Sequence, residues 1–437
     1  MRLRLTRLWD RVRSSYWFVP AGMTLASTVL AVAITAFERG PAGHELVTFI
    51  PLQRVSPDGA RAILSTLAGS MVTLAGVTFS ITIVALTVAS SQFGPRLLAN
   101  FMRDTGNQVS LGTFIATFTF SLLVLRRVGD VGGVEFVPQL GLTVAMALGI
   151  VSLGVLIYFI DHVSRSIQAR QVIAVAGRQV DRALEVSFPE GEEAPEEDEA
   201  IVQELIGRTA AGTAITAEQS GYVEIVDDDG LLEAATEFDL LIELCCRTGE
   251  FVVEGEPLLR VLPTPPPEAE ERLRDCIALT VRRPDRGDVL TSIRQVVEVG
   301  VRALSSGVND PFTAANCIEQ LGASLRLLAE RGPSVRLRRD DDGKPRLVLP
   351  SSPIEELVDA AFDQLRHYGR DTLIVPLTLI HTLSALGAQA RQPDLRAALR
   401  VHLERVHDAS LDTLPLEADR QHLEKAYRMA RKVLKVE

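Results

Sequence analysis

Six hydroxyl side chains recur at helical spacing along one long uncharged stretch of the sequence. On an ideal α-helix they fall within an arc of roughly 100°, and Gly69 and Gly76 lie at its edge. Such hydroxyls can line a path for polar solutes, or they can bond to the carbonyl one turn earlier inside a packed bundle. Both interpretations stay open, although a span without ionisable residues favours packing. The six residues are Thr66, Ser70, Thr73, Ser80, Thr87 and Ser91.

A second group, Arg302, Asn309 and Asp310, lies at a break between two helical patterns. Asp310 stands directly before Pro311, an order typical of an N-cap followed by the first residue of a helix. Asn309 and Gly307 suit positive φ angles, and we expect Arg302 to pair with Asp310. The group is either a structural turn or a docking corner that meets the membrane part, and the sequence favours neither.

No pattern of catalytic residues is present. The sequence has no Walker A loop, no GxGxxG after a strand and no HExxH, and its seven histidines form no ligand motif. The four cysteines match no zinc spacing, so we interpret them as small buried apolar residues in a reducing compartment. We therefore predict that the protein is not an enzyme and has no cofactor or metal site. The cysteines are Cys245, Cys246, Cys276 and Cys317.

The elements that hold these residues begin with four apolar stretches, and roughly 20 apolar residues suffice to cross a bilayer. The second stretch is longer than a crossing requires, so it must tilt or project from the membrane. A hydroxyl stripe in the third and a Gly-Ala-Gly stripe in the fourth favour helix packing. The predicted spans are residues 17–37, 62–92, 106–125 and 136–160. The two stripes are Ser110, Thr113, Thr117 and Ser121, and Gly141, Ala145 and Gly149.

Charge divides the chain into two halves and predicts its orientation. Residues up to Val186 carry 16 Lys+Arg and 10 Asp+Glu, whereas the remainder carries 29 and 46, which argues against nucleic-acid binding. Eleven arginines flank the spans on the side of the N-terminus and five on the opposite side. Because the side richer in arginine faces the cytoplasm, both termini should be cytoplasmic.

The remainder reads as a soluble α+β domain. We assign residues 1–162 to the membrane domain, 163–186 to a helical extension, 187–211 to a disordered acidic linker, 212–263 to a barrel-like β module and 264–437 to a mainly helical region. The segment 335–349 reads as a hairpin. The apolar segment Thr372–Ala390 could be mistaken for a fifth span, but Pro376 and His381 favour a buried core helix.

Two resemblances bear on function. The phrase TGEFVVEGEPLLRV at 248–261 resembles biotinyl and lipoyl barrels, but their carrier lysine has no counterpart because the first lysine is Lys344. The phrases RALSSGVNDPFTAANC at 302–317 and AGSMVTLAGVTFSITIVALTVASSQFGPRLL at 68–98 resemble the bacterial membrane-protein family called domain of unknown function 2254. This second resemblance covers nearly the whole chain and implies four spans and a cytosolic tail, but no reaction.

Together these patterns predict a four-span α-helical transmembrane bundle followed by a cytosolic α+β domain. Two functions follow. The first is an oligomeric channel or transport pathway that the cytosolic domain regulates. The second is a membrane-anchored scaffold or sensor that conducts nothing. Four helices are too few to enclose a wide pore, so a channel requires a ring of copies. We therefore expect a homo-oligomer in the lipid bilayer.

Overall fold

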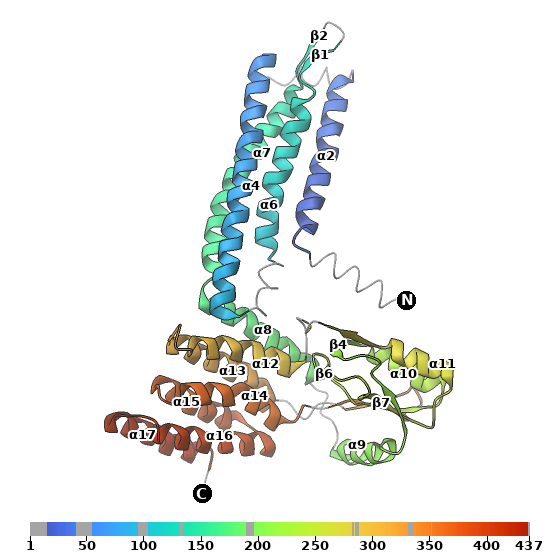
Figure 1. Cartoon of the computed structure of the whole chain (residues 1–437), viewed down its shortest axis with the longest axis vertical. Coiled ribbons are helices and arrows are strands. Elements are labelled where there is room, and N and C mark those ends of the chain that lie inside the picture. Colours follow the sequence, from blue (N-terminus) through green and yellow to red (C-terminus); the bar gives the residue numbers. More distant parts are fainter. Residues whose placement is uncertain are drawn as a thin grey trace. The chain divides into compact units, whose positions relative to one another are not determined.

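The computed structural model describes residues 15–40, 55–94, 104–131, 134–188, 196–281, 284, 288–330, 336–350 and 352–435. The chain divides into two compact units, Met1–Gln171 and Val172–Glu437. The first unit contains four long apolar helices, and the second contains the two larger sheets and a stack of helices (Figure 1). The predicted combination of a membrane bundle with an α+β part is confirmed.

Four helices of the first unit are long and apolar enough to cross a membrane. They are α2 (Phe18–Arg39), α4 (Pro57–Phe93), α6 (Thr105–Leu125) and α7 (Gln139–Ser166). The short strands β1 (Gly129–Val131) and β2 (Val134–Phe136) pair as an antiparallel hairpin between α6 and α7. The arginines at positions 2–13, 54, 96 and 103, on which the predicted orientation partly depends, lie outside the described residues.

Helix α6 is the centre of this bundle and packs against α2, α4 and α7 (Figure 1). The buried hydroxyl residues and Gly112 of α6 have small side chains, so three neighbouring helices can pack closely around it. The side chain of Ser27 on α2 donates to the carbonyl of Ala116, at 2.6 Å. The hydroxyls of Thr117 on α6 and Ser152 on α7 lie 3.2 Å apart. Small residues allow such close approach between helices in lipid.

The second unit begins with two helices on either side of the acidic segment, α8 (Ala169–Ser187) and α9 (Glu196–Thr209). The prediction of a disordered linker over 187–211 is wrong for α9, while residues 189–195 lie outside the described residues. Val202 and Leu205 of α9 are buried in a cluster with Leu337 and Val348. Burial of this apolar stripe outweighs the acidic composition on which the prediction rested.

Two sheets form the β part. The five-stranded sheet has the order β3-β7-β5-β10-β9, and the three-stranded sheet has the order β6-β4-β8. Strands from beyond residue 263 pair with strands of both sheets, so the β part is larger than the predicted module. The strands are β3 (Thr213–Thr216), β4 (Gly221–Val226), β5 (Leu241–Leu244), β6 (Phe251–Val252), β7 (Pro257–Leu262), β8 (Ile277–Thr280), β9 (Leu337–Arg339) and β10 (Pro345–Val348).

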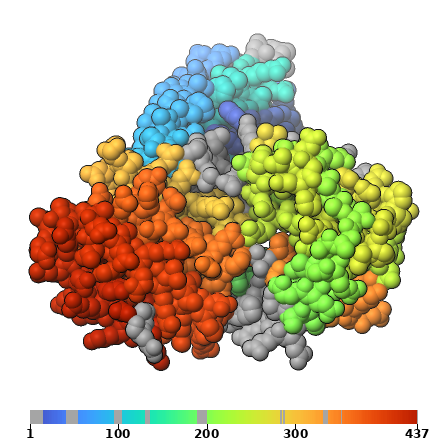
Figure 2. Space-filling view, turned by 60° about the horizontal axis from the view of Figure 1, so that its bottom comes forward, coloured from blue at the N-terminus to red at the C-terminus, as the bar shows by residue number. Residues whose placement is uncertain are grey.

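Helices α10 (Asp228–Glu237) and α11 (Pro267–Asp275) accompany the sheets. Leu231, Ala234 and Leu273 from these helices join the buried core of the β part. The other side of the five-stranded sheet receives α9, and Figure 2 shows the green surface of α9 beside the orange β9–β10 hairpin. This hairpin, predicted over 335–349, pairs in the antiparallel sense as expected.

The remaining helices stack in successive pairs (Figure 1). They are α12 (Val289–Ala303), α13 (Pro311–Glu330), α14 (Ile354–Gly369), α15 (Ile374–Gln389), α16 (Pro393–Leu411) and α17 (Glu417–Val433). Leu379, Ile380 and Leu383 of α15 are fully buried between neighbouring helices. The prediction that this apolar segment is a buried core helix and not a fifth span therefore agrees with its place inside the second unit.

Candidate functional site

The six hydroxyls of the second span share one face of α4, and all six are exposed within the described part of the first unit. A Cβ added to Gly69 or Gly76 would meet no described atom within 4 Å. Val77 and Val84 on the same face are 47% and 62% exposed. No described helix of the first unit packs against this face, so the packing that the sequence favoured would here require a helix of another chain. The exposed hydroxyls are Thr66, Ser70, Thr73, Ser80, Thr87 and Ser91.

Most of these hydroxyls have a partner in their own helix. Thr66, Thr73 and Thr87 donate to the carbonyl four residues earlier, at 2.8, 3.1 and 2.9 Å. Ser91 donates to the carbonyl of Val88 at 2.9 Å. The donors are therefore satisfied without water, while the acceptor lone pairs stay exposed on the surface. The face is compatible with water or with a second helix.

The stripes of the third and fourth spans are buried, unlike that of α4. Ser110, Thr113, Thr117 and Ser121 are all buried inside the bundle. A Cβ on Gly141 would lie 3.1 Å from Val124, and one on Gly149 would lie 2.7 Å from Leu67. The packing interpretation is confirmed for both stripes, so α4 is the helix whose small-residue face stays uncovered within the described first unit.

A polar cluster that the sequence did not reveal lies near one end of the bundle. The Nε2 atom of His162 on α7 lies 2.7 Å from Oδ1 of Asp104, which also caps α6 by accepting from the amide of Asn107. Tyr158 stacks on the imidazole with ring centroids 5.3 Å apart. Gly106 leaves space for the imidazole, because a Cβ atom added at this position would lie 2.6 Å from Nε2 of His162. Asp104 and His162 are 58 positions apart, so local spacing gave no signal.

Glu38 forms a second connection between spans. It is 6% exposed at the end of α2, and its carboxylate accepts from the amides of Leu140 and Gly141 at 2.6 and 3.1 Å. These amides belong to the first turn of α7, where a helix has unpaired N–H groups and a positive dipole end. A carboxylate from another helix thus caps α7. The sequence placed Glu38 just outside the first span and assigned it no role.

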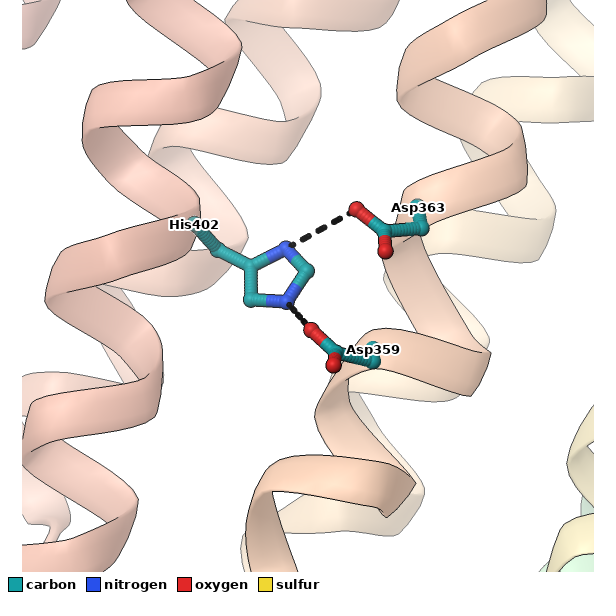
Figure 3. Close-up of side chains that lie close together, drawn as sticks. All are labelled: Asp359, Asp363 and His402. Carbon is teal, nitrogen blue, oxygen red and sulfur yellow. Dashed lines mark hydrogen bonds and ion pairs between the residues drawn. The ribbon is translucent and has the colours of Figure 1, made fainter.

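In the second unit, Asp359, Asp363 and His402 bring three potential metal ligands together (Figure 3). His402 on α16 is 1% exposed, with Nε2 2.7 Å from Oδ1 of Asp359 and Nδ1 4.0 Å from Oδ1 of Asp363. Burial lowers the pKa of His402, although the hydrogen bond to Asp359 opposes that effect. The ring therefore favours its neutral form. The sequence shows no ligand motif among its histidines, so His402 was assigned no role there.

Two arginines already neutralise these carboxylates. Nη1 of Arg405 lies 3.0 Å from Oδ1 of Asp359 and 3.7 Å from Oδ1 of Asp363. Nη2 of Arg366 lies 3.0 Å from the same oxygen of Asp363. A dication would have to enter beside two fixed positive charges, which disfavours it electrostatically. We interpret the group as an ion-pair network that joins α14 to α16.

The corner between α12 and α13 is a helix cap. Oδ1 of Asp310 accepts from the amide of Thr313 at 3.1 Å, and Oδ2 accepts from its hydroxyl at 2.7 Å. Asn309 has a φ of 49°, as expected, whereas Gly307 is not among the described positive-φ residues. The expected pair with Asp310 is wrong, because Arg302 pairs with Glu298 one turn earlier on its own helix, 3.6 Å away.

The cysteines differ in exposure. Cys246, Cys276 and Cys317 are buried, as predicted, but Cys245 is partly exposed. Burial raises the pKa of Cys246 to about 12 and that of Cys245 to about 11. Thiols with such pKa values carry little thiolate at neutral pH and are poor nucleophiles. The cysteines therefore form no reactive centre.

Comparison with known proteins covers most of the chain. A family model described as "Predicted membrane protein (DUF2254)" matches residues 13–385. An uncharacterized protein of Mycobacterium bovis is 30% identical over 372 residues, which are 84% of this chain and 71% of that protein. An uncharacterized protein of Mycobacterium tuberculosis matches with the same identity and coverage. No solved structure matches the chain.

Proposed function

The chain belongs to the family of predicted membrane proteins DUF2254, and from this premise we propose that it forms a polar pathway through a bacterial inner membrane. Several copies assemble so that their α4 faces line the pathway. Both termini lie in the cytoplasm, and the second unit regulates passage. This function requires no catalytic residue and no cofactor.

The exposed face of α4 is the observation that supports this proposal. Glycine at Gly69 and Gly76 destabilises an exposed helix by about 1 kcal/mol relative to alanine, and it offers lipid little surface to contact. Close approach by another helix uses such positions. The hydroxyls add polarity to the same face. Helix α4 has 37 residues, or about 55 Å at 1.5 Å per residue, which exceeds a hydrocarbon core of about 30 Å.

The pathway must lie between copies. Helix α6 fills the middle of the bundle with buried side chains such as Phe114 and Phe120, both fully buried. A ring of identical chains presents the same face repeatedly around one axis. The outward hydroxyls of α4 then meet in the centre of the ring.

Oligomer formation is tested by substitution at an open glycine. Gly76→Leu fills the α4 face, whereas Gly154→Leu places the same side chain on α7 at another position with no described atom within 4 Å. We expect light scattering of the purified protein to give a multiple of the chain mass for wild type and Gly154→Leu, and a smaller mass for Gly76→Leu. A monomeric wild type would contradict the proposal.

The alternative is a membrane-anchored scaffold or sensor without conduction. The hydrogen bonds of Thr66, Thr73 and Thr87 to their own helix favour it, because they satisfy the donors without water. Thr73→Val and Ser80→Ala separate the two functions, since they remove a hydroxyl and nearly keep the size. Slower solute flux in proteoliposomes with an unchanged oligomer supports the pathway, and unchanged flux supports the scaffold.

A further inference from the structure

A cavity of about 520 Å³ opens in the second unit between the five-stranded sheet, the end of α9 and the start of α14. Small-molecule sites typically measure about 300–1,000 Å³. Fourteen residues from these separate elements line it, including Ile206, Cys245 and Val348. The cavity lies well apart in sequence from the membrane spans, and part of its lining comes from the segment 248–261 that resembles biotinyl and lipoyl barrels.

One wall of the cavity carries a loosely joined pair of opposite charges. Glu243 on β5 stands directly opposite Arg260 on the neighbouring strand β7. Their closest atoms, Oε2 and Nη1, are 4.0 Å apart, which is the outer limit of an ion pair. Oε2 also accepts from the hydroxyl of Thr209 at 2.5 Å, so the carboxylate is fixed while the guanidinium is 37% exposed. This geometry leaves room for a ligand to contact both groups.

Another part of the lining joins the β part to the helical stack. Arg247 follows β5 and binds both carboxylate oxygens of Glu356 in the first turn of α14, at 3.0 and 3.4 Å. It also donates to the hydroxyl of Ser352 at 3.2 Å. The cavity therefore lies at a joint between two parts of one unit. A molecule bound there touches both sides of the joint.

The lining defines the chemistry of the ligand. Three arginines and three glutamates line the cavity together with apolar residues, so the charges balance. Because the lining contains no aromatic residue, a nucleobase would find no ring on which to stack, and the balanced charges give a polyphosphate no net positive site. The charged residues are Arg247, Arg260, Arg336, Glu243, Glu250 and Glu356, and the apolar lining includes Ile206, Val348 and Leu349.

We propose that this cavity binds a free α-amino acid with an aliphatic side chain. The carboxylate of the ligand pairs with Arg260, its ammonium group pairs with Glu243, and its side chain lies against the half-buried Ile206 and Leu349. Such a ligand pairs with the guanidinium of Arg260 and with the carboxylate of Glu243, which are 4.0 Å apart and pair only loosely with each other. Control of the membrane pathway by this ligand rests on the function proposed above, whereas the binding step does not.

Cys245 provides a direct readout because it lines the cavity and is partly exposed, while the other three cysteines are buried. The purified full-length protein is treated with excess iodoacetamide at alkaline pH over hours, because the raised pKa of Cys245 slows its alkylation, and the reaction of Cys245 is followed by peptide mass spectrometry. We expect L-leucine at saturation to slow alkylation about fivefold or more, because a bound ligand blocks access to the thiol. Glycine, alanine and valine extend the series of probes.

Two comparisons make the test specific. Arg260→Gln should abolish protection, whereas the control Arg338→Gln, which removes an arginine paired with Asp229 outside the cavity, should keep it. 4-Methylpentanoate and 3-methylbutylamine, which carry one charge each, should not protect. Equal protection by either single-charge compound would overturn the zwitterion assignment. No protection by any of the four amino acids would overturn the site. Neither result depends on solute flux, so failure of this site is distinguishable from failure of the pathway.

Discussion

His402 and His407 lie on the same helix, α16, and both face carboxylates, but their pKa values shift in opposite directions. Burial lowers the pKa of His402 despite its bond to Asp359. Burial also lowers the pKa of His407, but hydrogen bonds to Asp408 and Glu424 outweigh it, and the pKa is raised. The folded state therefore favours neutral His402 and protonated His407. Their contributions to stability must change with pH in opposite directions.

The two histidine variants should consequently differ in pH dependence. Below about pH 6.5 the unfolded chain binds a proton more readily than buried His402 does, so this residue destabilises the folded state as pH falls. Melting temperatures between about pH 8 and pH 5 should show His402→Gln gaining relative to wild type on acidification. His407→Gln should lose, because the contribution of His407 is present at acid pH and fades as pH rises through its raised pKa. Parallel curves for both variants would contradict these environments.

The helix cap at Asp310 should contribute measurably to the stability of the folded protein. Asp310→Ala removes both acceptors for Thr313 and should lower the free energy of unfolding by about 0.5–2 kcal/mol. Asp310→Asn, which retains one acceptor oxygen, should lose less. Chemical denaturation of the purified variants measures both values. If the corner also docks a partner, flux falls further than the folded fraction does, and equal losses leave it a structural turn.

Residue roles could be predicted where the cause is local. The cap at Asp310 follows from its place directly before Pro311, and the structure confirms it. The pairing of Arg302 could not be predicted correctly, because Glu298 lies on the same helical face and competes with Asp310. The contacts of Asp104 with His162 depend on helices that meet far apart in sequence, so single-residue patterns carried no sign of them.

For the helices, the length of the apolar stretches was enough to predict the spans. It did not predict which face of each span is buried against neighbouring helices. The stripes on α4 and α6 look alike in sequence, because in both the hydroxyls recur at spacings that keep them on one face of a helix. Helix α6 is surrounded by three neighbours, whereas α4 has its stripe on the outside. The difference depends on how the four helices assemble. Similarly, α9 forms despite its acidic composition because a sheet face receives its apolar stripe.

Two glycines on α7 test this assignment of covered and open faces. Gly149 faces Leu67 of α4, while a Cβ on Gly154 would meet no described atom within 4 Å. We expect Gly149→Val to destabilise the bundle by about 1–3 kcal/mol, the typical cost of overpacking. Gly154→Val should stay close to wild type. Thermal melting in detergent distinguishes the two, and equal losses would show that the packing of α7 against α4 is misassigned.

For the whole molecule, the distribution of arginines predicts the orientation in the membrane. Asp58 stands at the start of α4 with a side chain that is 95% exposed. In intact cells, a membrane-impermeant thiol reagent should label Asp58→Cys from outside. A cysteine appended after Glu437 should react only once the cells are lysed. The reverse pattern would overturn the predicted orientation and, with it, the cytoplasmic position of the amino-acid site.

The proposed pathway requires that the α4 faces of several copies meet around water. The reactivity of thiols placed on these faces measures whether water reaches them. Thr73→Cys and Ser80→Cys place thiols on the face, and Val29→Cys places one on α2 at a position that is 61% exposed. A small water-soluble methanethiosulfonate is applied to membranes, and each labelled peptide is quantified. We predict that the two α4 thiols react about tenfold or more faster than Val29→Cys, since a wet surface supports thiolate and lipid does not. If all three thiols are equally inert, the α4 face is dry and the pathway does not exist.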